Sequence, residues 1–173
     1  MLHRGCVPKE AVEVYVPDSV KMIDDSCFAG ASVKSIRFSA MSHLTFIGHS
    51  AFDGSDLKKI NFPAPLRFIG VSAFNQTALE VVNLSDTDIE HIGSCAFANC
   101  AKLMKAELPD SVEMLPNGCF YSCRQLMKIN LKKVRLIDKD AFRGCDDLIK
   151  VERSAYSNIE YIGEGNEPIK TLL

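Results

Sequence analysis

Cysteine and histidine are the side chains in this chain that could bind a metal, form disulfides or supply a nucleophile and a base. The 173 residues include seven cysteines and four histidines. The closest cysteine pairs, Cys95 with Cys100 and Cys119 with Cys123, both lack the Cys-x-x-Cys spacing of common zinc sites. Because no histidines cluster with them, we expect no metal site and no cofactor. The odd number of cysteines excludes a fully paired disulfide scaffold.

One group of residues resembles the components of a hydrolytic site. His43, His49 and Asp53 are close in sequence, and serines are plentiful around them. Nucleophilic catalysis needs such a base to be oriented by a third group inside a pocket that excludes water. The chain has no Gly-rich phosphate-binding loop, and surface positions explain these residues more simply. We therefore expect no enzymatic activity.

Composition and charge restrict the function further. Twenty basic and twenty-two acidic residues leave a net charge of −2, which does not favour nucleic-acid binding. The apolar runs are too short for a transmembrane helix, and the first residues lack the apolar core of a signal peptide. The sequence as written therefore predicts a cytoplasmic protein without membrane insertion. A fragment of a longer chain could instead belong to a secreted or cell-surface protein.

An internal repeat must position all of these side chains. A phenylalanine follows a small residue every 22 to 24 positions, and an apolar residue comes five positions before it. The phenylalanines are Phe28, Phe52, Phe74, Phe97, Phe120 and Phe142. The apolar residues before them are Ile23, Ile47, Ile69, Ile92, Leu115 and Ile137, and Ile162 begins a seventh unit.

Each unit also contains a short segment that predicts a half-buried strand. Apolar and polar residues alternate at 14–16, 36–38, 60–62, 82–84, 106–108 and 129–131. Prolines 17, 63 and 109 follow three of these segments and end them. Helical repeats need about 33 residues or more, so these units are too short for them. The pattern predicts a solenoid of about 6–7 coils of 22–24 residues, with short parallel strands on one face and few or no regular helices.

The repeat unit resembles that of the BspA-like leucine-rich repeat family. Its pattern is L-x-x-I-x-(L/F)-P-x-S-V-x-x-I-x-x-x-A-F-x-x-C, with the best copies at 103–123 and 126–145. The resemblance covers residues 11–162 and implies a leucine-rich-repeat solenoid. Members occur on bacterial surfaces and among protist proteins, and the family is implicated in adhesion and protein binding rather than catalysis. The chain departs from the pattern in its export signal, which it lacks, and in its seventh unit, which has no Ala-Phe pair.

The repeats divide the chain into three parts. Residues 1–13 are expected to form a partial coil or cap, residues 14–162 the BspA-like repeats, and residues 163–173 the C-terminal end. Cys6 falls at the position of the phenylalanine column, so the first coil is incomplete. An uncapped coil exposes apolar groups and could make end-to-end contacts, unless the opening segment folds over it.

Cysteines recur at one position of the repeat, where a small and weakly polar side chain is required. We expect buried free thiols there, although stacked coils would also bring such cysteines within reach of a disulfide. The cysteines are Cys100, Cys123 and Cys145, and the earlier units have Ala31, Ser55 and Thr77.

Outward positions of the predicted strands are the natural binding surface of a solenoid. One column holds Tyr15, Arg37, Asn61, Asn83 and Asn130, with Glu107 and Glu152. The column before it holds Lys59, Lys105, Lys128 and Lys150. These lysines could bind an acidic protein segment or an anionic glycan. The alternative is that they keep an exposed sheet soluble, because glutamates interrupt the stripe.

A third column lies just before the inward isoleucines and is unusually apolar. If it faces inward, its side chains are buried in the core, as large apolar residues usually are. If it faces outward it forms an apolar stripe that marks a protein interface. We expect the column to face inward and pack in the core, but it is also the best candidate for a partner surface. It comprises Met22, Phe46, Phe68, His91, Met114, Leu136 and Tyr161.

The sequence therefore predicts a non-enzymatic adaptor or scaffold that binds a partner protein through an extended face of the solenoid. One alternative is a surface adhesin fragment that binds host matrix proteins or other cells. Another is a binder of anionic glycans or polymers that uses the lysine column. The sequence does not identify the partner.

Overall fold

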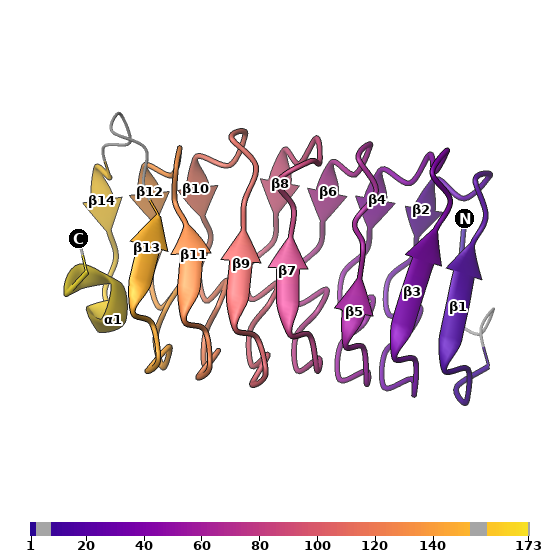
Figure 1. Cartoon of the computed structure of the whole chain (residues 1–173), viewed down its shortest axis with the longest axis horizontal. Helices are drawn as coiled ribbons and strands as arrows, with labels where there is room; N and C mark the ends of the chain where they lie inside the picture. Colours follow the sequence, from indigo (N-terminus) through magenta and orange to yellow (C-terminus); the bar gives the residue numbers. More distant parts are fainter. Residues whose placement is uncertain (3–7, 153–158, 173) are drawn as a thin grey trace.

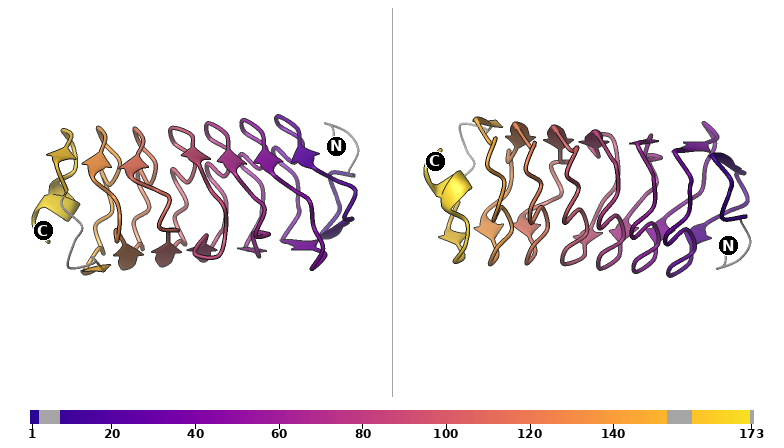
Figure 2. Two further views of the ribbon diagram at one scale, coloured as in Figure 1. Left: turned by 90° about the horizontal axis from the view of Figure 1, so that it is seen from above. Right: turned by 90° about the horizontal axis from the view of Figure 1, so that it is seen from below.

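The structure is a computed structural model that describes residues 1–2, 8–152 and 159–172. It is a solenoid of stacked coils, as the repeat predicts (Figure 1). Each coil contributes two short strands that lie on opposite sides of the stack (Figure 2). Coil 1 holds β1 and β2, and the numbering continues in pairs to coil 7, which holds β13 and β14.

The predicted strands form one side of the solenoid, which we call the odd-strand face. They pair in parallel with their neighbours, so that equivalent residues of successive coils lie side by side. The strands are β1 (Glu13–Val16), β3 (Ser35–Phe38), β5 (Lys59–Ile60), β7 (Val81–Asn83), β9 (Lys105–Glu107), β11 (Lys128–Asn130) and β13 (Lys150–Glu152).

The opposite side, which we call the even-strand face, also consists of parallel strands. Each is two residues long and ends on the inward apolar residue of its unit. The strands are β2 (Met22–Ile23), β4 (Phe46–Ile47), β6 (Phe68–Ile69), β8 (His91–Ile92), β10 (Met114–Leu115), β12 (Leu136–Ile137) and β14 (Tyr161–Ile162).

Neither sheet is continuous along the whole solenoid. The odd strands form one sheet of β1, β3 and β5 and another of β7, β9, β11 and β13. The even strands separate between β8 and β10. Coil 4 therefore pairs with coil 5 on the odd-strand face and with coil 3 on the even-strand face (Figure 1). It is the junction between the two halves of the solenoid.

The core follows the predicted columns. The six repeat phenylalanines are at most 1% exposed, and their rings stack from coil to coil with centroid separations of 4.8 to 5.8 Å. Parallel stacking of this kind adds to the free energy that comes from burying large apolar side chains. A single coil could not bury these rings, so the coils stabilise one another.

Backbone hydrogen bonds also join the return segments. The N–H of Phe28 donates to the carbonyl of Ala51 at 2.7 Å, and that of Phe52 donates to Ala73 at 2.7 Å. Each return segment turns through residues with positive φ, several of which are not glycine, such as Ser50 and Gln76. Coil stacking therefore offsets a backbone conformation that costs about 1 to 2 kcal/mol for an ordinary residue.

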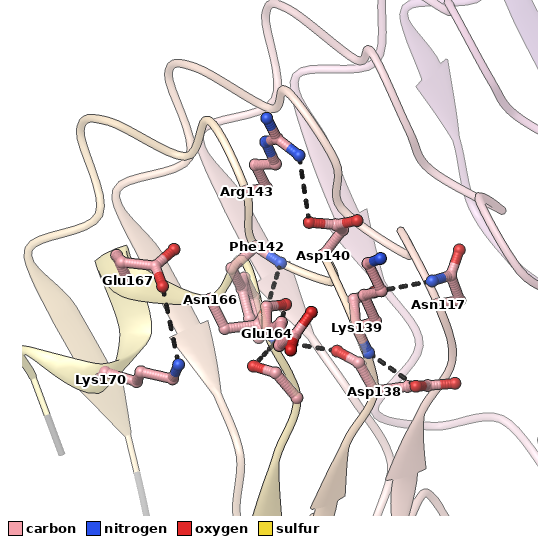
Figure 3. A network of polar contacts seen from close by, with 11 residues as sticks. Asn117, Asp138, Lys139, Asp140, Phe142, Arg143, Glu164, Asn166, Glu167 and Lys170 are labelled. Atoms are coloured by element: carbon pink, nitrogen blue, oxygen red, sulfur yellow. Dashed lines mark hydrogen bonds and ion pairs between the residues drawn. The ribbon is translucent and has the colours of Figure 1, made fainter.

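The two ends of the solenoid differ. At the N-terminal end, the N–H of Leu2 donates to the carbonyl of Met22 at 2.9 Å, so Leu2 extends the sheet beyond β2. Cys6 lies outside the described residues. At the other end, the short helix α1 (Glu167–Lys170) lies against the last coil and buries Ile169 completely (Figure 3). Among the described residues, no helix has the length and apolar character needed to span a bilayer.

Candidate functional site

The odd-strand face presents most of the polar residues expected there. Arg37, Asn61 and Asn83 are exposed, and the side chain of Tyr15 is 64% exposed. Three of the predicted lysines, Lys59, Lys105 and Lys128, are also exposed. The backbone of Lys150 pairs with that of Lys128, but its side chain lies outside the described part.

Asn130 was expected on this surface, and that expectation is wrong. Its side chain is only 7% exposed and turns back onto the neighbouring coil. The side-chain oxygen accepts a hydrogen bond from the N–H of Leu108, and the amide nitrogen donates to the carbonyl of Leu108 at 2.9 Å. Because the amide satisfies both polar groups of one backbone residue, Asn130 joins two neighbouring coils.

The lysine column carries less free charge than the sequence indicates. Lys105 forms an ion pair with Glu107 of its own strand. Val81 occupies the column between Lys59 and Lys105, and the sheet also breaks there, between β5 and β7. The break therefore separates the single lysine Lys59 from the lysines of β9, β11 and β13.

The apolar column faces outward on the even-strand face, which corrects the expectation of core packing. Every even strand has two residues, and since neighbouring residues of a strand point to opposite sides, an inward isoleucine or leucine forces its predecessor outward. Met114 is 51% exposed, Tyr161 55% and Leu136 38%, whereas Phe46 and Phe68 are half-buried.

Aromatic rings in this column stack on one another. The ring centroids of Phe46 and Phe68 are 4.5 Å apart, and those of Phe68 and His91 are 4.8 Å apart. The edge of the His49 ring contacts Phe68, with the centroids 6.2 Å apart. Stacking shields the faces of Phe46 and Phe68 from water and fixes their side-chain angles. The column is therefore a preorganised apolar surface.

Ion pairs that the sequence analysis missed border the apolar column. Arg67 bonds Glu90, and Arg135 bonds Glu160, in each case across one coil step. The residues precede the apolar column directly, so opposite charges one repeat apart were the available signal. A polar rim beside an apolar strip is the arrangement of typical protein interfaces.

Two adjoining grooves open beside the even-strand face, where coils 4 and 5 meet. One of about 280 Å³ lies between β8 and β10, and its lining includes Glu90, His91 and Met114. The other, of about 540 Å³, shares Glu90 and Ser111 with it and continues along the turns. The sequence analysis did not anticipate either groove. A third, of about 340 Å³, lies at the break between β5 and β7.

The cysteine column has a structural role. The thiols of Cys100, Cys123 and Cys145 donate to phenylalanine carbonyls of the preceding coil at 3.0 to 3.2 Å. Burial raises the pKa of Cys145 to about 12 and that of Cys123 well above its ordinary value. Protonated, buried thiols are poor nucleophiles and poor metal ligands. Among the residues described, no group of three or more metal-binding side chains forms a site.

The residues that resembled a hydrolytic site have other partners. Nδ1 of His49 accepts a hydrogen bond from the N–H of Val71 at 2.9 Å. Asp53 accepts a bond from the side chain of Asn75 at 2.8 Å. Both residues therefore join neighbouring coils and do not form a base with its orienting group.

Comparison with known proteins agrees with this architecture. The BspA type leucine rich repeat region matches the chain in six copies, over residues 10–87 and 45–166. A leucine-rich repeat protein from Bacteroides ovatus is 30% identical with a TM-score of 0.74, and the match covers 88% of this chain and 39% of that one.

The leucine rich repeat protein of T. pallidum shares the fold at 23% identity, with a TM-score of 0.59 and coverage of 90% of this chain and 89% of that one. No curated protein matches the chain. The six matched repeats and the stacked coils confirm the predicted resemblance and the predicted fold class. The chain belongs to the BspA-type leucine-rich repeat family.

Proposed function

We propose that this chain is a non-enzymatic interaction module, an adaptor or scaffold, that binds a partner protein through the apolar column of the even-strand face. The observation that carries the proposal is the outward orientation of this column along the solenoid. Monomeric proteins rarely leave apolar strips of this kind in water, and here two of them flank the break between β8 and β10. Its members are Met22, Phe46, Phe68, His91, Met114, Leu136 and Tyr161.

The chemistry of the column suits protein binding. The stacked rings of Phe46 and Phe68 are already ordered, so binding costs them little conformational entropy. Met114 is flexible and polarisable and can adapt to an irregular partner surface. The ion pairs at the border supply directional contacts, because their side chains stay accessible to water. Together they form an apolar centre with a polar rim.

Two exposed residues allow a test that spares the core. Leu136→Lys with Tyr161→Lys places charge in the column, and Tyr15→Lys with Val81→Lys makes the same change on the odd-strand face. The native complex is purified from the source cells for each variant and sized. We expect the first pair to release the partner and the second pair to retain it. Loss of the complex only with the second pair would contradict the proposal.

The lysine column supports a second candidate function, the binding of an acidic polymer. Lys105 and Lys128 are exposed and in register on adjacent strands, so both can contact one polymer, with the charge of Lys105 reduced by its ion pair with Glu107. The test changes Lys59, Lys105, Lys128 and Lys150 together to Glu and measures heparin binding at low salt. The control variant carries the same changes at Lys21, Lys102, Lys133 and Lys139. Equal binding by the two variants would rule out this candidate.

Two cellular settings fit such a module, an adaptor in a reducing compartment and an adhesin at the cell surface. The hydrogen-bonded thiols of the cysteine column support the first, because a disulfide would remove their donors. The mass of protein from its native source, with and without alkylation under non-reducing conditions, separates the two settings. Seven thiols that alkylate after denaturation support the adaptor, and disulfides or attached glycans support the adhesin.

A further inference from the structure

Pro116 interrupts the even-strand sheet between β8 and β10. In coils 2 to 4 the residue after the inward isoleucine is a glycine whose N–H donates to the preceding coil, as Gly70 does to Ile47 and Gly93 to Ile69, both at 2.8 Å. Pro116 occupies this position in coil 5 and has no N–H to donate. The missing N–H distinguishes Pro116 from the other residues at this position, because Asp138 of coil 6 has a side chain there and its N–H still donates to the carbonyl of Leu115 at 2.9 Å.

The interruption leaves hydrogen-bond acceptors without backbone partners. Between coils 3 and 4, where β6 pairs with β8, the carbonyl of Arg67 accepts hydrogen bonds from the N–H groups of Glu90 and His91 at 2.9 and 3.1 Å. Within the described residues, no backbone N–H donates in the same way to the carbonyls of Glu90 and Ile92. The Met114 N–H likewise has no backbone acceptor there. The groove of about 280 Å³ occupies this break.

The break has two glutamates on consecutive coils at one repeat position. At the repeat position that borders the apolar column, Arg67 pairs with Glu90 across one coil step, and Arg135 pairs with Glu160. Between them, Glu90 faces another glutamate, Glu113, at the next step, and both line the groove. Glu113 forms a longer ion pair with Arg135, at 3.8 Å, without a hydrogen bond. Two glutamates thus line the groove on consecutive coils, whereas the steps from Arg67 to Glu90 and from Arg135 to Glu160 place a guanidinium beside a carboxylate.

The aromatic stack ends at the same break. Phe46, Phe68 and His91 stack in sequence, and Met114 occupies the next position of the column, across the groove. His91 and Met114 therefore both line the groove, and the stack of rings ends at its edge. A flat group of the thickness of a ring can continue the stack there.

We propose that this break, which we call the seam slot, binds an arginine side chain of the partner protein. The slot is lined by Glu90, His91, Ile92, Ser111, Glu113 and Met114. A guanidinium is flat, stacks on rings and carries five N–H donors for carboxylates and carbonyls. Lysine supplies the charge but neither the planar surface nor the paired donors. The inference rests on the proposed function, because it specifies how a partner on the even-strand face is recognised.

Magnetic resonance of the full chain, labelled with nitrogen-15, tests the slot directly. N-acetyl-arginine amide is the probe, and N-acetyl-lysine amide at equal ionic strength is its control. We expect the arginine probe to shift the amide signals of residues 90–92 and 111–114 saturably and the lysine probe to shift them much less. Equal shifts with both probes, or shifts spread over all acidic residues, would overturn the proposal.

Two variants separate the slot from general electrostatic attraction. Glu90→Gln with Glu113→Gln should weaken arginine binding about tenfold, and Asp146→Asn with Asp147→Asn, which removes equal charge from an exposed turn, should not. Pro116→Gly keeps both glutamates but restores the missing N–H, so we expect it to close the sheet and abolish binding. Full binding by Pro116→Gly would contradict the slot.

These experiments leave the proposed function to a separate test. The Leu136→Lys and Tyr161→Lys pair lies outside the slot, so it can release the partner whether or not arginine binds. Failure of the arginine probe alone would remove the slot and leave the even-strand face as the partner surface.

Discussion

The side-chain oxygen of Asn166 accepts a hydrogen bond from the backbone N–H of Phe142 at 2.8 Å (Figure 3). In earlier coils the equivalent phenylalanine N–H donates to a backbone carbonyl of the next coil, as Phe120 does to Ala141 at 2.9 Å. The amide nitrogen of Asn166 also donates to the carbonyls of Asp138 and Gly163. A single buried amide thus replaces the contacts of a following coil.

Removing this amide should unfold the C-terminal end first. Asn166→Ala leaves the Phe142 N–H buried and unpaired, which costs about 1 to 3 kcal/mol. Urea denaturation gives the change in free energy of unfolding, and hydrogen exchange should show the loss of protection concentrated in coils 6 and 7. Asn117→Ala, which removes one exposed hydrogen bond to Lys139, is the control and should cost about 0.5 kcal/mol or less. Equal losses would contradict this role of Asn166.

Two glycines should respond differently to the same substitution. Gly70→Ala puts a Cβ 2.6 Å from the backbone of Gly48 and His49, so the coils must separate, and we expect a loss of about 3 kcal/mol. Gly54→Ala meets no atom within 4 Å and strains only a φ of +64°, which costs about 1 kcal/mol. Urea denaturation of both variants measures the difference. A larger loss for Gly54→Ala would show that the coils are not packed closely at Gly70.

Alkaline pH should destabilise the protein through its buried thiols. Because burial raises the pKa of Cys145 to about 12, the unfolded chain releases this proton near pH 9 while the folded chain retains it. The stabilisation is complete below pH 9 and decreases as the pH rises toward 12. Cys145→Ser keeps a small donor that does not titrate in this range. Melting temperatures between pH 7 and 10.5 should therefore fall less steeply for Cys145→Ser than for the wild type, and parallel curves would contradict the assignment.

The parts of the structure that the sequence could predict are those that every repeat shows. The phenylalanine column and the three-residue alternation around residues such as Ile36 and Ile129 identify the core and the odd strands. The even strands contain only two residues each, so no alternation exists to reveal which way Phe68 or Met114 points. Their exposure became evident only once the parallel pairing was known.

Other features depend on contacts between coils. Asn130 looks like any outward polar residue, and its burial follows from the Leu108 backbone one coil away. The seam slot had a visible signal, since Pro116 stands where Gly48, Gly70 and Gly93 stand in other units. Its effect on the sheet required the hydrogen-bond pattern of the neighbouring coils.

The central claim is that the partner binds the even-strand face, and two tyrosines on opposite faces allow its most direct test. Tyr161 is 55% exposed on the even-strand face, and Tyr15 is 64% exposed on the odd-strand face. A photo-crosslinking amino acid replaces each tyrosine in turn, and the source cells are irradiated. We predict one discrete crosslinked partner from position 161 and none from position 15. A partner captured only from position 15 would contradict the account.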